Sequence, residues 1–325
     1  MPVVAVLMPC RNAAPWVAAA VRSCLEQDVD CEVIAVDDGS TDATREILGQ
    51  FGPAVTVVDG PAKGAPTARN IAFEASSAPF VQYLDADDVI LPGKFEAQVG
   101  YLEANPTDAV YGDWRYWFHD GETQRLGPVQ RAGPQEDPVE ALLDDWWVPS
   151  MAPLYRREAV AASGGWDPSA RAGQDHDFLL SVVIAGAVLA YQPGCHSLYR
   201  RHGEGTVSRN ADPTEWLAAR VAMLEKAESA LVRQGSLTPA RRESLSRSYA
   251  RLAGWWWDHD RDRARSLHAR ALEMGTGIDP GASAGYRRVL AVAGFERAEQ
   301  LASIRRRALR RLGRSFEDPH PTPGR

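Results

Sequence analysis

Short apolar runs alternate with helix-like segments through the first 84 residues, and this alternation constrains the fold more than any other feature. Residues 3–8 form a continuous apolar run, as expected of a central parallel strand covered on both faces. The other strand-like runs are 31–36, 55–58 and 79–84. Their short connections to intervening helices predict a parallel, doubly wound α/β sheet. Right-handed crossovers then bring the carboxyl ends of these strands to one edge.

Polar residues occur where each of these strands ends or where the following helix begins. The four clusters are residues 9–12, Asp37 with Asp38, Arg69 with Asn70, and residues 85–88. Ligands of open α/β folds bind at this edge of the sheet. A phosphate there would find a charged partner in Arg69 and amide donors at the starts of helices. Arg69 in a surface ion pair and Asp37 or Asp38 as a helix cap are the plain structural alternatives.

Asp85, Asp87 and Asp88 place three carboxylates within four residues after a strand. Such hard oxygen ligands suit Mg²⁺ or Mn²⁺, and those ions usually bridge to a phosphate. Taken alone, the cluster fits a polar turn with an Asp helix cap equally well. The neighbouring clusters therefore decide its interpretation.

The pattern changes after residue 92. We expect further strands at 109–118, 151–155 and 188–192, helices at 95–104, 139–147, 157–163 and 177–185, and a polar loop at 120–138 that can act as a lid. Beyond residue 212 we expect helices only, at 214–233, 239–257, 261–274 and 285–312. The predicted domains are 1–210 for the α/β part, 211–316 for a helical extension and 317–325 for a disordered tail.

The net charge of −7 argues against a protein whose overall positive charge binds nucleic acid. The four cysteines form no C-x-x-C pair, so we expect free thiols in a reducing compartment. Pro9 interrupts the first apolar run, which argues against a signal peptide, and the longest apolar stretch, 178–191, is too short to span a bilayer. We therefore expect a cytoplasmic protein.

The four clusters together resemble glycosyltransferase family 2, whose members have the GT-A fold. The motifs that carry the resemblance are Met8-Pro9-Cys10-Arg11-Asn12, residues 36–42, Gly64 with Ala68-Arg69-Asn70, and Leu84-Asp85-Ala86-Asp87-Asp88. The resemblance covers about residues 3–208. It implies a Rossmann-like mixed sheet flanked by helices, a nucleotide-diphosphate-sugar donor and a divalent metal in an Asp-x-Asp site.

The resemblance also implies roles for single residues. Asp38 would contact the nucleobase, Arg69 the nucleotide, Asp85 ribose or metal, and Asp87 the metal and diphosphate. His202 resembles a histidine of the family that approaches the metal or diphosphate, although a lone histidine is more often structural. Pro9, Arg11, Asn12 and Ala86 belong to the donor-binding motifs.

Asp175 is the candidate catalytic base. In the family a Glu-Asp pair precedes a helix, and here the matching residues are Gln174 and Asp175. A carboxylate beside the acceptor hydroxyl can remove its proton as the sugar carbon is attacked. A single displacement of this kind inverts the anomeric carbon. The alternative for Asp175 and Asp177 is helix capping, which we assign to Asp177.

Two other functions remain open at this point. The first is a haloacid-dehalogenase-type phosphatase with Asp85 as nucleophile, which leaves Asp38 and Arg69 unexplained. The second is a nucleotide-sugar-binding protein without catalysis, which leaves Asp87 and Asp175 unexplained. We expect a transferase whose first candidate donor is a UDP-sugar. Sugars carried by dTDP or GDP are the alternatives. Its acceptor would be a hydroxyl of a glycan, a glycolipid or a small molecule.

From position 286 to the end, the chain has ten arginines and four acidic residues, and the helix expected at 285–312 also has an apolar stripe. We expect this stripe to pack on the other helices or on a second subunit, as in a homodimer. The alternative is peripheral contact of residues 285–314 with anionic lipid at the inner face of a membrane. Trp146, Trp147 and Trp166 could stack on a sugar or lie in the core.

Overall fold

The structure, a computed structural model, describes residues 2–121, 123–203 and 212–311. It divides into two compact units. The first consists of Met1–Pro138, Trp147–Ala170 and Gln174–Glu204, and the second of Val139–Trp146, Arg171–Gly173 and Gly205–Arg325. The second unit thus takes in segments that the sequence interpretation assigns to the α/β part. The division at residues 210 and 316 stays a prediction, and the expected tail at 317–325 lies outside the described residues.

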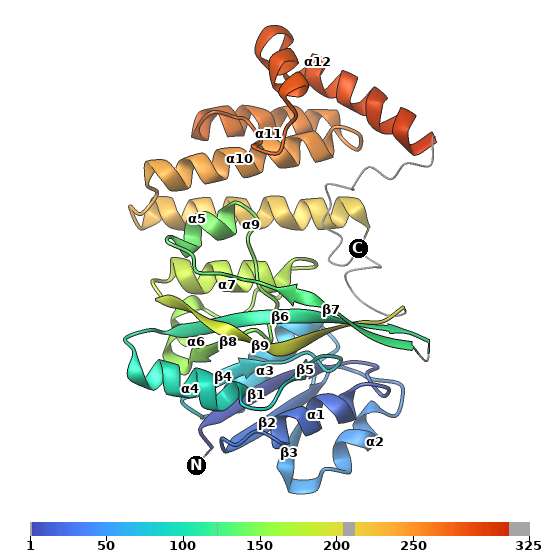
Figure 1. Cartoon of the computed structure of the whole chain (residues 1–325), viewed down its shortest axis with the longest axis vertical. Helices are drawn as coiled ribbons and strands as arrows, with labels where there is room; N and C mark the ends of the chain where they lie inside the picture. Colours follow the sequence, from blue (N-terminus) through green and yellow to red (C-terminus); the bar gives the residue numbers. More distant parts are fainter. Residues whose placement is uncertain (1, 122, 204–211, 312–325) are drawn as a thin grey trace. The chain divides into compact units, whose positions relative to one another are not determined.

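A nine-stranded mixed sheet forms the centre of the first unit (Figure 1). Its strands are β1 (Val4–Cys10), β2 (Cys31–Asp37), β3 (Val55–Asp59), β4 (Phe80–Tyr83), β5 (Val89–Ile90), β6 (Ala109–Asp120), β7 (Thr123–Gln130), β8 (Pro153–Arg156) and β9 (Leu189–Arg201). Their order is β3-β2-β1-β4-β8-β6-β9-β5, and β7 pairs with β6. The first four strands are parallel, as predicted, and β8 is antiparallel to both β4 and β6.

Helices cover both faces of this sheet. They are α1 (Val17–Leu25), α2 (Thr44–Gly49), α3 (Ala65–Glu74), α4 (Lys94–Ala104), α6 (Arg157–Ser163) and α7 (Gln174–Ile184), with a short 3₁₀ helix at Gly52–Ala54. Alternate residues of a strand face opposite sides. Val4, Val6 and Met8 of β1 accordingly pack in one core cluster with side chains of α1, α2 and α4. On β4, Tyr83 contacts the ring of Phe178 in α7.

The polar segment at 120–138 is not all loop, so this prediction was wrong. Residues 123–130 form β7, which pairs antiparallel with β6. The strand is mostly exposed and contains Gly127 and Pro128, which hide the usual apolar alternation but are tolerated at a sheet edge. A contact between the two strands stabilises β7, because the Arg125 guanidinium lies 4.5 Å over the ring of Phe118 in β6.

Two other boundaries differ from the sequence prediction. Helix α7 begins at Gln174 rather than at residue 177, which puts Asp175 and Asp177 in its first turn. Carboxylates are favourable there because they face the positive end of the helix dipole. Strand β9 continues to Arg201 rather than ending at residue 192, because it pairs with β6 as far as Phe118.

The helices of the second unit begin and end close to the predicted positions, except that α5 ends at Leu143 and not at residue 147. They are α5 (Pro138–Leu143), α9 (Pro213–Arg233), α10 (Pro239–Trp256), α11 (Arg261–Met274) and α12 (Ala284–Arg311). Side-chain oxygens of Asp212, Thr238 and Asp260 accept backbone N–H bonds at three helix starts. Helix α12 differs from the expected continuous helix, because its backbone is non-helical at Gly294.

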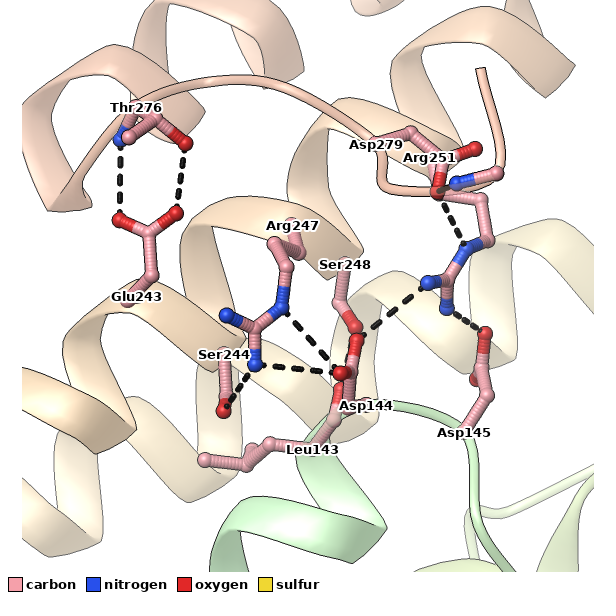
Figure 2. A network of polar contacts seen from close by, with 11 residues as sticks. Leu143, Asp144, Asp145, Glu243, Ser244, Arg247, Ser248, Arg251, Thr276 and Asp279 are labelled. Atoms are coloured by element: carbon pink, nitrogen blue, oxygen red, sulfur yellow. Dashed lines mark hydrogen bonds and ion pairs between the residues drawn. The ribbon is translucent and has the colours of Figure 1, made fainter. Parts of the chain in front are cut away.

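A polar network fixes the end of α5 within this unit (Figure 2). Asp144 accepts from Arg247 and Arg251, and Asp145 pairs with Arg251 and Arg220. The Ser248 hydroxyl donates to the carbonyl of Leu143. These partly buried pairs satisfy one another's charge, as such groups require away from water.

The apolar stripe of α12 is only partly buried. Phe295 and Ala298 are 8% and 2% exposed, and Phe295 stacks on the ring of His268. Leu301 and Ile304 are 55% and 64% exposed. The expected packing on the other helices therefore accounts for the beginning of the stripe and leaves its later part uncovered in this chain.

Candidate active site

The carboxyl ends of β1, β2 and β4 meet at one edge of the sheet, as predicted. Pro9 pairs with Val36 in the parallel ladder, and residues 84–88 follow β4 beside β1. Arg11 is exposed, whereas the side chain of Ala86 is 5% exposed and belongs to the core. A donor contact from Ala86 would therefore come from its backbone.

Asn12 and Asp38 organise the loops at this edge. Asn12 adopts a left-handed backbone with φ 50°, and its Oδ1 accepts the N–H of Thr41 at 2.8 Å. Asp38 is 2% exposed, and its carboxylate accepts the N–H groups of Lys63 at 3.2 Å and Gly64 at 2.6 Å. Asp38 thus fixes the loop that starts α3, so the residue expected to contact the nucleobase also has a structural task.

Arg69 is the centre of the site. It is 2% exposed and lies on α3. Its Nη2 lies 2.5 Å from Asp85 Oδ1 and 4.0 Å from Asp175 Oδ1, and its Nη1 donates to Gln174 Oε1 at 3.1 Å. The guanidinium also lies 4.1 Å over the ring of Trp166. One buried cation therefore joins two of the predicted carboxylates, which excludes a simple surface ion pair.

Asp175 is partly buried and has two neighbours in the site, Arg69 and the Ser150 backbone. Its side chain is 23% exposed, and its Oδ2 accepts the N–H of Ser150 at 3.2 Å. Burial raises the pKa of Asp175 to about 6 and Asp85 acts in the same direction, whereas Arg69 and the Ser150 N–H oppose the rise. A carboxylate with this pKa is ionised near neutral pH and can still accept a proton.

Gln174, which stands where the family has Glu, is a hydrogen-bonding partner rather than a second charge. It accepts from Arg69, and its Nε2 donates to the carbonyl of Ala170 at 3.2 Å. The neutral side chain leaves the positive charge of Arg69 to Asp85 and Asp175. The orientation of α7 at Asp175 is therefore supported without the usual Glu.

Asp87 and His202 form a second group at the site. His202 Nε2 lies 3.0 Å from Asp87 Oδ2, with side chains 12% and 33% exposed. Arg200 supports the neighbouring backbone, because its Nε donates to the Asp87 carbonyl at 2.6 Å and its N–H to Asp88 Oδ1 at 2.8 Å. Burial, together with Asp87 and Asp85, raises the pKa of Asp88 well above its usual range. Asp88 is thus a buried structural carboxyl.

The three tryptophans that could stack on a sugar or lie in the core have different surroundings in the structure. Trp166 is 2% exposed and stacks on Phe178 with ring centroids 4.2 Å apart, so it belongs to the core beneath Arg69. Trp147 lies 5.6 Å from the ring of Trp114 in the first unit, and Trp146 belongs to the second unit.

Sequence reasoning missed Ser150 and Arg200 as site residues. Ser150 acts through its backbone N–H, which no residue type reveals. Arg200 could have been found from its charge two residues before His202. Within the described ranges, no three His, Cys, Asp or Glu side chains are placed to hold a metal ion by themselves. The same part of the chain contains no helix that is both long and apolar enough to cross a bilayer.

Comparison with known proteins agrees with this geometry. The model of the family "Glycosyl transferase family 2" matches residues 5–161. TuaG of Bacillus subtilis, named for teichuronic acid biosynthesis, is 38% identical over 228 residues, which are 67% of this chain and 85% of TuaG. Two further curated relatives are matched over about half their length, 52% and 41%.

Solved structures show the same fold. Residues 1–349 of Staphylococcus aureus TarS, in complex with UDP-GlcNAc, align with a TM-score of 0.60 and 14% identity over 83% of this chain and 88% of that one. The mannosyltransferase PcManGT of Pyrobaculum calidifontis, in complex with GDP-Man and Mn²⁺, aligns with a TM-score of 0.54 and 21% identity over 93% and 83%. These similarities favour neither the phosphatase nor the non-catalytic binder. The chain has the GT-A fold and belongs to glycosyltransferase family 2.

Proposed function

We propose that this enzyme transfers a sugar from a nucleotide-diphosphate donor to an acceptor hydroxyl with inversion, and that Asp175 is the base. The observation that carries the proposal is the half-buried Asp175 carboxylate, whose pKa is raised to about 6 beside Arg69 and Asp85. Asp175 removes the proton of the acceptor hydroxyl as its oxygen attacks the anomeric carbon. The bond from that carbon to the diphosphate breaks in the same displacement, so the configuration inverts.

Arg69 and Asp85 act on the nucleotide side of this reaction. The buried guanidinium brings positive charge to the edge where a diphosphate would bind, and its pairing with Asp85 limits its movement. Asp85 remains 29% exposed, which leaves carboxylate oxygen for a ribose hydroxyl. Asp38, Pro9, Arg11 and Asn12 belong to the same edge and are proposed to form the nucleoside end of the site.

A divalent cation fits the pair Asp87 and His202. Their oxygen and nitrogen atoms face each other at 3.0 Å, and neither side chain is fully buried. A carboxylate and an imidazole leave coordination positions for diphosphate oxygens, as Mn²⁺ or Mg²⁺ requires. Asp85 is the third predicted ligand, and its ion pair with Arg69 competes with that role. The cation would offset the charge that develops on the leaving diphosphate.

UDP is the first candidate for the nucleotide. TarS was solved with UDP-GlcNAc, and PcManGT with GDP-Man and Mn²⁺, so the fold admits more than one base. The acceptor is proposed to be a glycan, a glycolipid or a small-molecule hydroxyl. The relative TuaG is named for teichuronic acid biosynthesis, and this name is consistent with a role of the present chain in polysaccharide assembly.

The uncovered part of α12 is proposed to contact a second subunit or anionic lipid. Leu301 and Ile304 are exposed on a helix that also exposes Arg297. Sedimentation of the full chain with vesicles of neutral or anionic lipid distinguishes the two. Binding to anionic vesicles that is lost in Leu301→Glu/Ile304→Glu supports the lipid, and a monomer–dimer change without vesicle binding supports the subunit.

Calorimetric titration of UDP, GDP and dTDP, each with and without Mn²⁺, tests the proposed donor class. Binding of one nucleotide that needs Mn²⁺ supports the proposal and identifies the nucleotide for an acceptor screen. Binding that is equally tight without a metal would contradict metal dependence, and no binding of any nucleotide would contradict this donor class.

A further inference from the structure

The turn that precedes β8 is held by buried side chains from three other elements. The turn is residues 149–152, closed by a bond from the Ala152 N–H to the Pro149 carbonyl at 2.9 Å. Gln82 Nε2 and Ser197 Oγ donate to the Met151 carbonyl at 3.2 Å and 3.1 Å. Both of these side chains are at most 1% exposed. The turn therefore cannot shift without leaving buried donors unpaired, which is costly.

The neighbouring carbonyl, that of Ala152, is held from α4. Lys94 Nζ and Gln98 Nε2 each donate to it at 3.0 Å, and Lys94 Nζ also donates to Gln98 Oε1 at 2.5 Å. The side chain of Lys94 is fully buried. Burial lowers the pKa of Lys94 to about 7 from its ordinary 10.5.

A buried ammonium group needs an explanation, because an apolar side chain of similar size would avoid the loss of hydration. Gln98 alone supplies one donor to the Ala152 carbonyl, so backbone satisfaction does not require Lys94. What Lys94 adds is a second bond to the same carbonyl, which restricts the movement of that carbonyl. Lys94 is therefore not needed to satisfy the Ala152 carbonyl. Its effect is to fix the position of the turn.

The turn presents the Ser150 N–H to Asp175. This bond, of 3.2 Å to Oδ2, is made two residues before the clamped Ala152. The other charged groups that act on Asp175 are Arg69 and Asp85. An N–H bond to a carboxylate stabilises its charged form. A shift of the turn would change both the direction and the proton affinity of this carboxylate.

We propose that Lys94 is a positioning residue: through the Ala152 carbonyl it holds the 149–152 turn where the Ser150 N–H meets Asp175. The inference rests on the proposed function only in that Asp175 is the base there. Lys94 itself is fully buried and bonds to Gln98 and Ala152, so it acts through the turn.

Titration of the Asp175 carboxyl carbon by NMR tests this without requiring activity. The signal is identified by its loss in Asp175→Asn. In Lys94→Met we expect the pKa of Asp175 to rise, and the rate of sugar transfer to fall about tenfold to a hundredfold, with the KM for the donor unchanged. Ser197→Ala is a smaller change that removes one of the two donors to the Met151 carbonyl. It should shift the same pKa in the same direction and keeps the test open if Lys94→Met does not fold.

Ser246→Ala is the matched control. Ser246 is also buried, and its hydroxyl donates to a backbone carbonyl, that of Ala271, at 2.8 Å in the second unit. Its loss should leave the titration of Asp175 unchanged. An unchanged Asp175 pKa in folded Lys94→Met or Ser197→Ala overturns the inference. A shifted pKa in a protein that transfers no sugar from any donor would uphold the positioning and overturn the proposed function.

Discussion

His202 Nε2 lies 3.0 Å from Asp87 Oδ2, although the two residues are 115 positions apart in the chain. Asp87 follows β4, and His202 follows β9. The last residue of β9, Arg201, pairs with Phe118 of β6. The sheet therefore brings an oxygen and a nitrogen donor together from two distant segments. This pair is where metal dependence is most directly tested.

Asp87→Ala should weaken Mn²⁺-dependent nucleotide binding by at least about tenfold, because one hard ligand of the proposed site is lost. Calorimetric titration of the nucleotide with and without Mn²⁺ measures the effect. Binding in the absence of metal should match the wild type. If the variant keeps the full Mn²⁺ effect, Asp87 is not a ligand.

Asp175→Asn should bind the donor normally and lose transfer by about 10²–10⁴-fold, the usual contribution of a general base. The amide keeps the size of the side chain, so the contact with the Ser150 N–H can persist while the proton acceptor is lost. Single-turnover transfer together with donor titration separates the two steps. Transfer at the wild-type rate would remove Asp175 as the base.

The rate of transfer should fall as the pH is lowered through about 6. The pKa of Asp175 is raised to about 6, mainly by burial, so the carboxylate becomes protonated below that pH and cannot accept a proton. A pH–rate profile from 5 to 8, with nucleotide binding measured in parallel, provides the check. A flat profile over this range would contradict the assignment.

Arg69→Met should lower the free energy of unfolding by roughly 1–3 kcal/mol, because Asp85 and Asp175 lose their shared cation. Arg45→Met is the matched control. Arg45 pairs with Asp59 at the same 2.5 Å, where both side chains are exposed, 53% and 82%, and it lies 3.5 Å from the buried Asp37. Its loss should cost less than about 1 kcal/mol. Equal losses in urea denaturation would show that the burial of Arg69 adds nothing.

Lys94 should make stability rise with pH between 7 and 10.5. Its pKa is about 7 in the folded protein and ordinarily 10.5, so the unfolded chain binds more protons in this window. The free energy of unfolding of the wild type should therefore gain up to about 1.4 kcal/mol per pH unit relative to Lys94→Met. Urea denaturation at pH 7, 8 and 9 measures the difference. Parallel profiles of the wild type and Lys94→Met would show that the pKa of Lys94 is not lowered in the folded protein.

The first half of the fold was predictable because its strands are continuous apolar runs between clear helix patterns. The same logic failed for β7, where Gly127, Pro128 and exposed polar residues resemble a loop although the strand pairs along β6. The pattern of Leu301 and Ile304 predicted a packed stripe, yet periodicity cannot tell whether a partner covers both ends of it.

The candidate site was predictable as a set of residue types and not as a set of contacts. Carboxylates after strands pointed to the sheet edge, and Asp85, Asp87 and Asp175 were singled out from the sequence. That Arg69 joins Asp85 to Asp175 depends on how α3, the segment after β4 and α7 come together in the fold, which sequence spacing does not contain. The support of Asp175 by the Ser150 backbone has no signature in residue identity at all.

The place of β9 has a consequence for how the chain is made. It is the last strand in the sequence, yet it lies between β6 and β5 in the sheet. During synthesis the edge of β6 stays unpaired until residue 201 has left the ribosome, a state that invites aggregation. The pairing of β5 with β9 spans more than a hundred residues, and contacts over such distances close slowly. A chain interrupted at residue 161 would contain every motif of the donor side and yet lack Asp175, His202 and the strand that completes the sheet.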